Sequence, residues 1–466
     1  MTMIEGVSRR TMLQLAGVVT AGMAIPALGA QSSTPGASTQ TPLLIRHATI
    51  LSMDPAIGDI TEGDVLIRDG AIAAVGKGLE ANGARIIDAR GMLLMPGLID
   101  SHWHMWNSVL RNAAPTGQGK TFFKTLAPLS AKFSPQLSRT GVRLSLAEAV
   151  NSGITTVNNW AHNIRGPAFA DAEVSALMES GLRARFWYGY PQDMAATAKM
   201  DFKDIQRLKA QLSGSSRIDL GLAIRGPERT GAGVWEEEFA FAKGQDLPIS
   251  THIAVTREAQ KKKAVRQLSE RKLLGSNVQL VHATHVDAED LRLIAESGAS
   301  VSLTPLTEMR VGYGLAQVMA LHEAKIPISL GIDTLVLSGN ANPFMVMQTT
   351  LNLATAMSEN ELALTPRQVL HWATQGGADE MGIGSITGSV TPGKRADLIL
   401  IDTRRMGLSP FTDPAASVVQ AATPADVHTV IADGRVLKQN GELLGIDVAA
   451  LINDAAQAWK ILNPAG

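Results

Sequence analysis

Residues 96–104 read Pro-Gly-Leu-Ile-Asp-Ser-His-Trp-His, and this stretch decides the predicted fold. Its apolar run ends in His102 and His104, which are two positions apart. Side chains with that spacing lie on the same face of a strand, whereas a helix would separate them. Two imidazoles that converge in this way can hold one cation, although a hydrogen-bonded surface pair is the simpler alternative. The stretch therefore predicts a strand whose carboxyl end is a candidate site.

Outward from this strand, apolar strand-like runs alternate with helical segments, which is the pattern of parallel β/α units. Eight such runs occur, at Met92–Ser101, Ile154–Trp160, Ala184–Tyr190, Ile218–Ile224, Pro248–His252, Val278–His282, Ser300–Leu303 and Ile326–Asp333. Over residues 96–385 they predict an α/β fold, a (β/α)8 TIM-like barrel. In such a barrel the catalytic side chains gather at the carboxyl ends of the strands.

Short β-branched runs with turn signals flank the barrel on both sides. The first set lies in residues 43–95 with a hairpin at Asp69-Gly70, and the second lies in residues 386–450 with a hairpin at Asp433-Gly434. Because both sets have the same character, we expect them to form one small β-sandwich. Residues 451–466 are expected to form a C-terminal helix or tail.

The composition is that of a soluble globular protein, and a small-molecule substrate has to be argued from a site. The 466 residues carry a net charge of −1, and 45% of them are hydrophobic against 18% charged, so nothing in the balance of charges indicates nucleic acid as a partner. Cysteine is absent, which excludes thiolate ligands, disulfides and a cysteine nucleophile. Any bound metal must therefore use nitrogen and oxygen ligands. We also expect a homo-oligomer.

The first residues are typical of a targeting segment. Residues 8–15 read Ser-Arg-Arg-Thr-Met-Leu-Gln-Leu, and a mildly apolar, glycine-interrupted stretch follows. This resembles a twin-arginine export signal over residues 1–30, followed by a flexible lead over residues 31–42. The apolar part is short for a membrane span, so an uncleaved anchor is the weaker alternative. We expect export to the periplasm and no stable membrane insertion after cleavage.

Further candidate ligands close three of the other predicted strands. His252 ends the fifth, His282 ends the sixth and Asp333 ends the eighth. Imidazoles together with a carboxylate suit one divalent transition metal, most simply zinc, while iron, cobalt and manganese are also compatible.

The chain resembles the amidohydrolase superfamily, in its branch of chlorotriazine hydrolases and cytosine-deaminase-like enzymes. The resemblance rests on the 96–104 stretch, the strand ends at His252, His282 and Asp333, and the closing segment 388–398. It implies that His102, His104, His252 and Asp333 are metal ligands and that His282 lies beside the water or the substrate. It also implies that Asp333 is the base that takes the proton of water, and that His282 polarises the group under attack. The fourth strand lacks the lysine that bridges two metals in other branches, which favours a single metal.

One departure from that family affects the predicted reaction. Its deaminases carry a glutamate three residues after the fifth-strand histidine, where it protonates a ring nitrogen, but this chain has Val255 there. Hydrolysis of an amide, urea or carbamate needs that proton less, so we expect cleavage of a non-peptide C–N bond of that kind. Deamination of a pyrimidine-, purine- or triazine-like ring is the alternative, with Glu308 or Glu258 as a substitute acid. An inactive metal-binding protein is a minor alternative.

Two segments resemble a narrower group, the phenylurea and thiocarbamate hydrolases. They are the loop that begins at His104-Met105-Trp106 and the second-strand run that ends in Trp160-Ala-His162-Asn. The resemblance implies that Trp106, Trp160 and His162 line a pocket for a small neutral or aromatic ligand. The tryptophans could equally pack beneath the loops. His285 could also face the site, whereas His47, His322, His371 and His428 are expected to be surface or packing residues.

Overall fold

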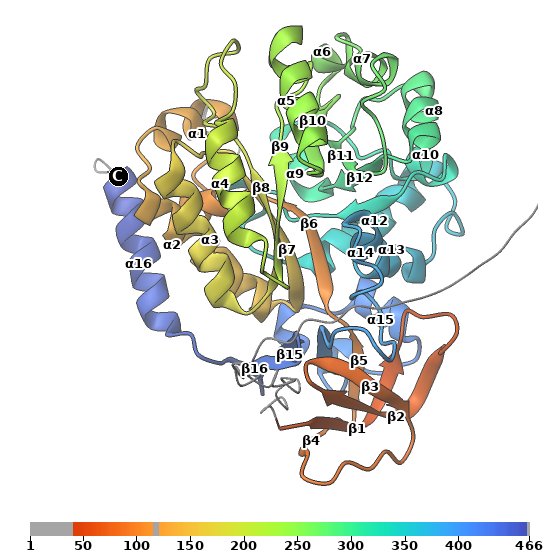
Figure 1. Cartoon of the computed structure of the whole chain (residues 1–466). Coiled ribbons are helices and arrows are strands. Elements are labelled where there is room, and N and C mark those ends of the chain that lie inside the picture. Colours follow the sequence, from red (N-terminus) through yellow and green to blue (C-terminus); the bar gives the residue numbers. More distant parts are fainter. Residues whose placement is uncertain (1–40, 115–120, 464–466) are drawn as a thin grey trace, which may run out of the picture. The chain divides into compact units, whose positions relative to one another are not determined.

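The computed structural model describes residues 41–114 and 121–463. The predicted export signal lies outside these residues. Within them, the strands form two sheets, and helices surround the second of these in Figure 1. No helix in the described part of the chain is both long enough and apolar enough to cross a membrane.

The first sheet is mixed and combines strands from both ends of the described chain (Figure 1). It contains β1 (Leu43–Leu51), β2 (Asp59–Arg68), β3 (Ala71–Gly76), β4 (Arg85–Asp88), β5 (Met92–Pro96), β14 (Leu398–Asp402), β15 (Val427–Ala432), β16 (Arg435–Gln439) and β17 (Glu442–Leu443). The antiparallel pairing of β14 with β5 joins the two halves. Both predicted hairpins are present, and the strands from the two halves pair into one mixed sheet, as expected from their common character.

The second sheet is the predicted parallel barrel. Its strands are β6 (Leu98–Trp103), β7 (Ile154–Ala161), β8 (Arg183–Tyr188), β9 (Ile218–Ala223), β10 (Ile249–Ile253), β11 (Val278–His282), β12 (Ser300–Leu303) and β13 (Ile328–Leu330), in that order across the sheet. A bridge between Trp103 and Asp333 closes the ring. The Asp333 amide donates to the His102 carbonyl at 2.7 Å, and the His104 amide donates to the Asp333 carbonyl at 2.6 Å. The closure therefore brings candidate ligands from the first and last strands side by side.

Two glycines allow close approaches that the barrel needs. A Cβ atom at Gly97 would lie 2.1 Å from the Thr155 hydroxyl, and one at Gly331 would lie 2.8 Å from the His102 carbonyl oxygen. Any larger residue would clash with the Thr155 side chain at Gly97 and with the His102 backbone at Gly331. Gly97 also separates β5 from β6, so the run predicted as one strand from Met92 to Ser101 is divided between the two sheets.

Helices follow the barrel strands and bury an apolar core against them, and two further helices, α15 and α16, follow strands of the mixed sheet. They are α1 (Phe122–Ser130), α2 (Pro135–Asn151), α3 (Pro167–Ser180), α4 (Phe202–Leu212), α5 (Ala232–Gly244), α6 (Arg257–Gln260), α7 (Ala264–Glu270), α8 (Ala288–Ser297), α9 (Pro305–Val311), α10 (Val318–Glu323), α11 (Leu335–Ser338), α12 (Pro343–Ser358), α13 (Pro366–Trp372), α14 (Gln375–Glu380), α15 (Pro414–Gln420) and α16 (Val448–Leu462). A second apolar cluster lies within the mixed sheet.

Candidate active site

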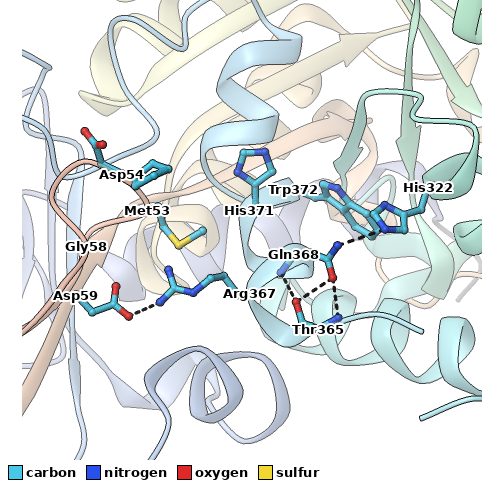
Figure 2. A pocket seen from close by; sticks show the side chains of 11 residues that line it. Met53, Asp54, Gly58, Asp59, His322, Thr365, Arg367, Gln368, His371 and Trp372 are labelled. Carbon is cyan, nitrogen blue, oxygen red and sulfur yellow. Dashed lines mark hydrogen bonds and ion pairs between the residues drawn. The ribbon is translucent and has the colours of Figure 1, made fainter. Parts of the chain in front are cut away.

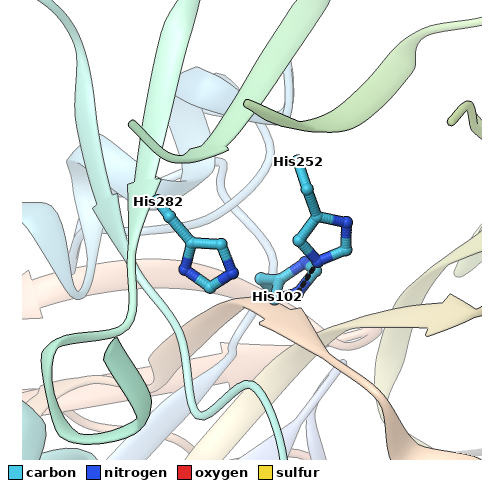
Figure 3. Close-up of side chains that lie close together, drawn as sticks. All are labelled: His102, His252 and His282. Atoms are coloured by element: carbon cyan, nitrogen blue, oxygen red, sulfur yellow. Dashed lines mark hydrogen bonds between the residues drawn. The ribbon is translucent and has the colours of Figure 1, made fainter. Parts of the chain in front are cut away.

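Four predicted ligands meet at the carboxyl end of the barrel. The Nε2 atom of His102 lies 3.2 Å from Nε2 of His104 and 3.2 Å from Nε2 of His252. The Oδ1 atom of Asp333 lies 3.3 Å from Nε2 of His104 and 3.6 Å from Nε2 of His102. All four side chains are buried. Figure 3 shows His102 and His252 directed at each other, with His282 beside them.

This donor set fits a metal ion. Zinc ligands at about 2.0–2.1 Å in a tetrahedron lie about 3.3–3.4 Å from one another, which is close to the four separations given above. His102 belongs to two groups of mutually close ligand atoms, one with His104 and Asp333 and the other with His252 and His282. Burial lowers the pKa of His102, His104 and His252, so their imidazoles are neutral and their lone pairs can bind a cation. His104 donates from Nδ1 to the Trp160 carbonyl at 3.1 Å, which leaves its Nε2 lone pair toward the cluster. The chain therefore contains a buried histidine and aspartate metal site.

One carboxylate oxygen of Asp333 lies in the ligand cluster, and the other accepts a hydrogen bond from a neighbouring helix. Its Oδ2 atom accepts a hydrogen bond from the Thr307 hydroxyl at 2.6 Å. Burial alone would favour the protonated acid, but His102, His282 and Thr307 hold the pKa of Asp333 below its usual value. The group is thus a carboxylate, as a metal ligand or a base requires. Sequence reasoning did not find Thr307, which lies in the first turn of α9 and fits no strand-end pattern.

His282 reaches the same cluster from the end of β11, and its ligand atom lies within 4.8 Å of those of His102 and His252. Its Nδ1 atom lies 3.2 Å from Glu308 and 3.0 Å from the Thr304 hydroxyl. Glu308 is fully buried behind this imidazole and does not line the cavity. Glu308, predicted from the sequence to contact the substrate, therefore lies outside the lining of the cavity, because the first turn of α9 directs its carboxylate at His282. Glu308 is a positioning residue for His282.

Glu258 is not a substitute acid either. It lies on α6 with an exposed side chain and pairs with Lys261 at 2.6 Å. Its carboxylate belongs to the outer surface of the barrel.

The metal cluster opens into a narrow cavity. The cavity is lined by His104, Phe122, Phe123, His162, Gln192, Arg229, His252, His282, Val311, Tyr313, Asp333 and Leu337. Of the predicted pocket residues outside the cluster, only His162 is among them. The lining residues that the sequence analysis missed include Arg229, Gln192, Tyr313 and the two phenylalanines. They come from loops or a helix end, where no periodic pattern predicts which side chains face a cavity.

Trp106, Trp160 and His285 lie behind the cavity wall instead of lining it, which corrects the sequence prediction. The Trp160 ring packs against His252 with centroids 4.3 Å apart, and its Nε1 donates to Ser250 at 2.9 Å. His285 contacts the Tyr313 carbonyl through Nε2 at 2.6 Å. Each of these residues supports a neighbour that is itself in the site.

Trp106 determines which ring nitrogen of His162 carries the proton. Its Nε1 can only donate, and it lies 3.2 Å from Nδ1 of His162, so that Nδ1 must be the unprotonated acceptor. The Trp160 carbonyl is 3.5 Å from the same Nδ1, but this carbonyl already accepts from His104 at 3.1 Å. Burial lowers the pKa of His162 to about 3, so the ring is neutral and its proton is on Nε2. The amide of Gln192 contacts Nε2, and its oxygen is the atom that can accept there. His162 therefore donates its single N–H to Gln192 at the cavity wall.

We expect Trp106→Phe to release this tautomer while keeping most of the packing. Loss of one hydrogen bond predicts about a 3- to 10-fold fall in kcat/KM. Nitrogen NMR of His162 should show Nε2 protonation in the parent protein and a mixture of tautomers in the variant. Phe133→Leu is the control, because Phe133 packs on Trp106 with centroids 4.8 Å apart and takes no part in the hydrogen bond. An unchanged tautomer in Trp106→Phe would show that Trp106 has no such role.

A larger cavity of about 580 Å³ lies elsewhere and shares no lining residue with the metal site. Figure 2 shows His322 and His371 beside Trp372, and Arg367 paired with Asp59. His322 contacts Gln368 through Nε2 at 3.3 Å. The two histidines are packing residues at the rim of this cavity, as the sequence predicted.

Comparisons with known proteins agree with the geometry. The model of the amidohydrolase family matches residues 93–437. A 5'-deoxyadenosine deaminase of Methanosarcina mazei is 28% identical over 431 residues, which cover 90% of this chain and 98% of the relative. An adenosine deaminase structure from Xanthomonas campestris with bound zinc has a TM-score of 0.84 at 24% identity, covering 91% of this chain and 99% of the other. A mutant of the atrazine chlorohydrolase from Arthrobacter aurescens, complexed with zinc and atraton, has a TM-score of 0.80 at 23% identity and covers 90% of this chain and 100% of the other.

These similarities bear on the narrower expectations. The relative compared above by sequence is a deaminase and not one of the phenylurea and thiocarbamate hydrolases that the Trp106 and Trp160 segments resemble. The match over most of the chain shows that the protein belongs to the amidohydrolase family and is a hydrolase of non-peptide C–N bonds.

Proposed function

We propose that this protein is a metal-dependent deaminase that replaces the amino group of a small heterocycle by oxygen, and that the metal is zinc. The observation that carries the proposal is the convergence of His102, His104, His252 and Asp333 in a chain similar over 90% of its length to a 5'-deoxyadenosine deaminase. The zinc in the adenosine deaminase structure supports the choice of metal.

The residues of the site have separate roles in this proposal. A divalent metal lowers the pKa of a bound water toward about 7, so that the water becomes a nucleophile at neutral pH. Asp333, ionised and held by Thr307, accepts the proton of that water and passes it to the departing nitrogen. His282, oriented by Glu308, contacts the atom that gains negative charge. His162, whose Nε2 donates to Gln192, forms part of the wall against which the heterocycle lies.

One residue favours a second candidate, hydrolysis of an amide, urea or carbamate. Val255 occupies the position of the glutamate that protonates the ring in the related deaminases, and Asp333 is the sole carboxylate among the described residues that line the cavity. Attack on a carbonyl needs no ring proton, so this site could act on it without that acid.

The two candidates release different products. The metal-loaded protein should be incubated with purine-, pyrimidine- and triazine-type amines, and separately with anilides, phenylureas and carbamates, with assays for ammonia and for organic amines. Ammonia from the heterocycles supports deamination. Organic amines alone would replace it by the second candidate, and turnover of neither set would favour a metal-binding protein without hydrolase activity.

Val255→Glu is expected to increase ammonia release by roughly 10- to 100-fold, because it restores a proton donor at the position where the related deaminases have one. Val255→Gln is the matched control, since it has similar size and polarity but cannot transfer a proton. The measurement is kcat on the best heterocycle of the panel. Equal rates for the Glu and Gln variants would mean that ring protonation does not limit this enzyme.

A further inference from the structure

Arg229 is the one arginine or lysine among the described residues that line the active-site cavity. It lies in the loop between β9 and α5, and its side chain is exposed. Among residues 41–114 and 121–463, no carboxylate pairs with its guanidinium; the ion pairs on this side of the barrel belong to other residues, such as Arg225 with Glu238. The neighbouring Tyr190 hydroxyl stays neutral, because burial raises its pKa, and so it does not cancel this charge. A charged donor group inside a catalytic cavity and without a carboxylate partner is available to a ligand.

The position of Arg229 is fixed by its loop. Gly226 has a φ of 66°, and its carbonyl accepts from the Arg229 amide at 3.3 Å and from the Thr230 hydroxyl at 3.1 Å. The neighbouring Glu228 accepts from the Ala254 amide at 2.6 Å, two residues after the ligand His252. The turn is therefore attached to the end of β10, and the Glu228 carboxylate is engaged with the backbone.

The charge balance of the cavity favours an anion. Its lining contains one carboxylate, Asp333, whose charge is directed at the metal cluster. With a divalent ion bound, positive charge exceeds negative charge in this narrow space. Such a cavity attracts ligands of negative charge. Phe122, Phe123 and Leu337 supply an apolar wall for a ring.

We propose that Arg229 is a specificity-determining residue that binds a carboxylate of the substrate, so that the preferred substrate is a ring with a carboxylate away from the reacting C–N bond. This inference rests on the proposed hydrolysis at the metal cluster. It replaces the neutral ligand expected from the sequence by an anionic one. Arginine suits the role because its planar guanidinium can donate two parallel hydrogen bonds to a carboxylate.

The test compares matched ligands on matched variants. Binding of benzoate and of benzamide to the zinc-loaded protein is measured by calorimetry for the parent, Arg229→Gln, Arg229→Lys and Arg257→Gln. Arg257 is the control because it is exposed on α6 near the same end of the barrel but does not line the cavity. We expect the parent to prefer benzoate, Arg229→Gln to weaken benzoate binding by roughly 10- to 100-fold without changing benzamide binding, and Arg229→Lys to lose less. Arg257→Gln should behave like the parent.

Benzoate bound only through the metal would keep its affinity in Arg229→Gln, and that result would overturn the proposal, as would a parent protein with no preference for benzoate. Turnover of heterocyclic amines with and without a ring carboxylate gives the second arm: Arg229→Gln should lower kcat/KM more for the carboxylates than for the neutral rings. Arginine-dependent benzoate binding without any turnover would reject the proposed deaminase and retain this inference. Turnover of neutral rings that is unaffected by Arg229→Gln, in a protein with no preference for benzoate, would reject this inference and retain the proposed deaminase.

Discussion

Asp333→Asn should lower kcat by about 10²- to 10⁴-fold while leaving most of the metal in place. The carboxylate has one oxygen in the ligand cluster and the other on Thr307, so the asparagine carbonyl can keep the first contact. The amide cannot accept a proton from water. Activity should therefore be lost through proton transfer, and metal analysis of the purified variant should still find about one ion for each chain.

The control for this variant is Asp426→Asn. Asp426 is also buried, but it caps a short helix through the Thr423 amide at 2.9 Å, remote in sequence and in contacts from the metal cluster. Its replacement should affect stability modestly and leave kcat close to that of the parent. If Asp333→Asn retained full activity with its metal bound, another group would have to be the base, and His282 would be the next candidate.

The strand ends of the barrel were predictable because parallel strands impose a simple geometry. An apolar run that ends in histidine places an imidazole at the carboxyl rim, and closure of the ring then places the ends of β6 and β13 in contact. His102, His104, His252, His282 and Asp333 all follow from this rule. No knowledge of side-chain packing was needed to bring them together.

The cavity wall was not predictable in the same way. Trp106 and Trp160 lie close to metal ligands, but their rings face the packed interior. The sequence alone does not show whether such a ring faces the cavity or the interior. Arg229 belongs to an irregular loop, where no periodicity predicts the direction of a side chain. Glu308 has the right chemistry for an acid, yet the first turn of α9 places it behind His282.

Two expectations concern properties outside the described site and stay predictions. They are export by the twin-arginine route, which rests on Arg9 and Arg10, and assembly into a homo-oligomer. A fusion of the first residues to a reporter that functions only after export, with both arginines replaced by lysine as the control, would test the first. Light scattering of the purified protein would test the second.

His252→Ala should remove the metal and, with it, activity by at least about 10³-fold, because without the ion the pKa of water returns from about 7 toward 15.7. His252 is the only cluster member contributed by β10, and its Nε2 lies 3.2 Å from that of His102, so its loss leaves a gap that alanine cannot bridge. Metal content should fall from about one ion for each chain to near zero, and the melting temperature of the variant should no longer rise when zinc is added, as binding to the folded state requires.

His428→Ala is the control, since His428 lies on β15 of the mixed sheet and contacts Thr429. Chelation of the parent protein should reproduce the His252→Ala phenotype, and added zinc should reverse it in the parent alone. A His252→Ala protein that kept both its metal and its turnover would mean that the ion lies elsewhere, and the roles assigned to Asp333 and His282 would then lose their basis.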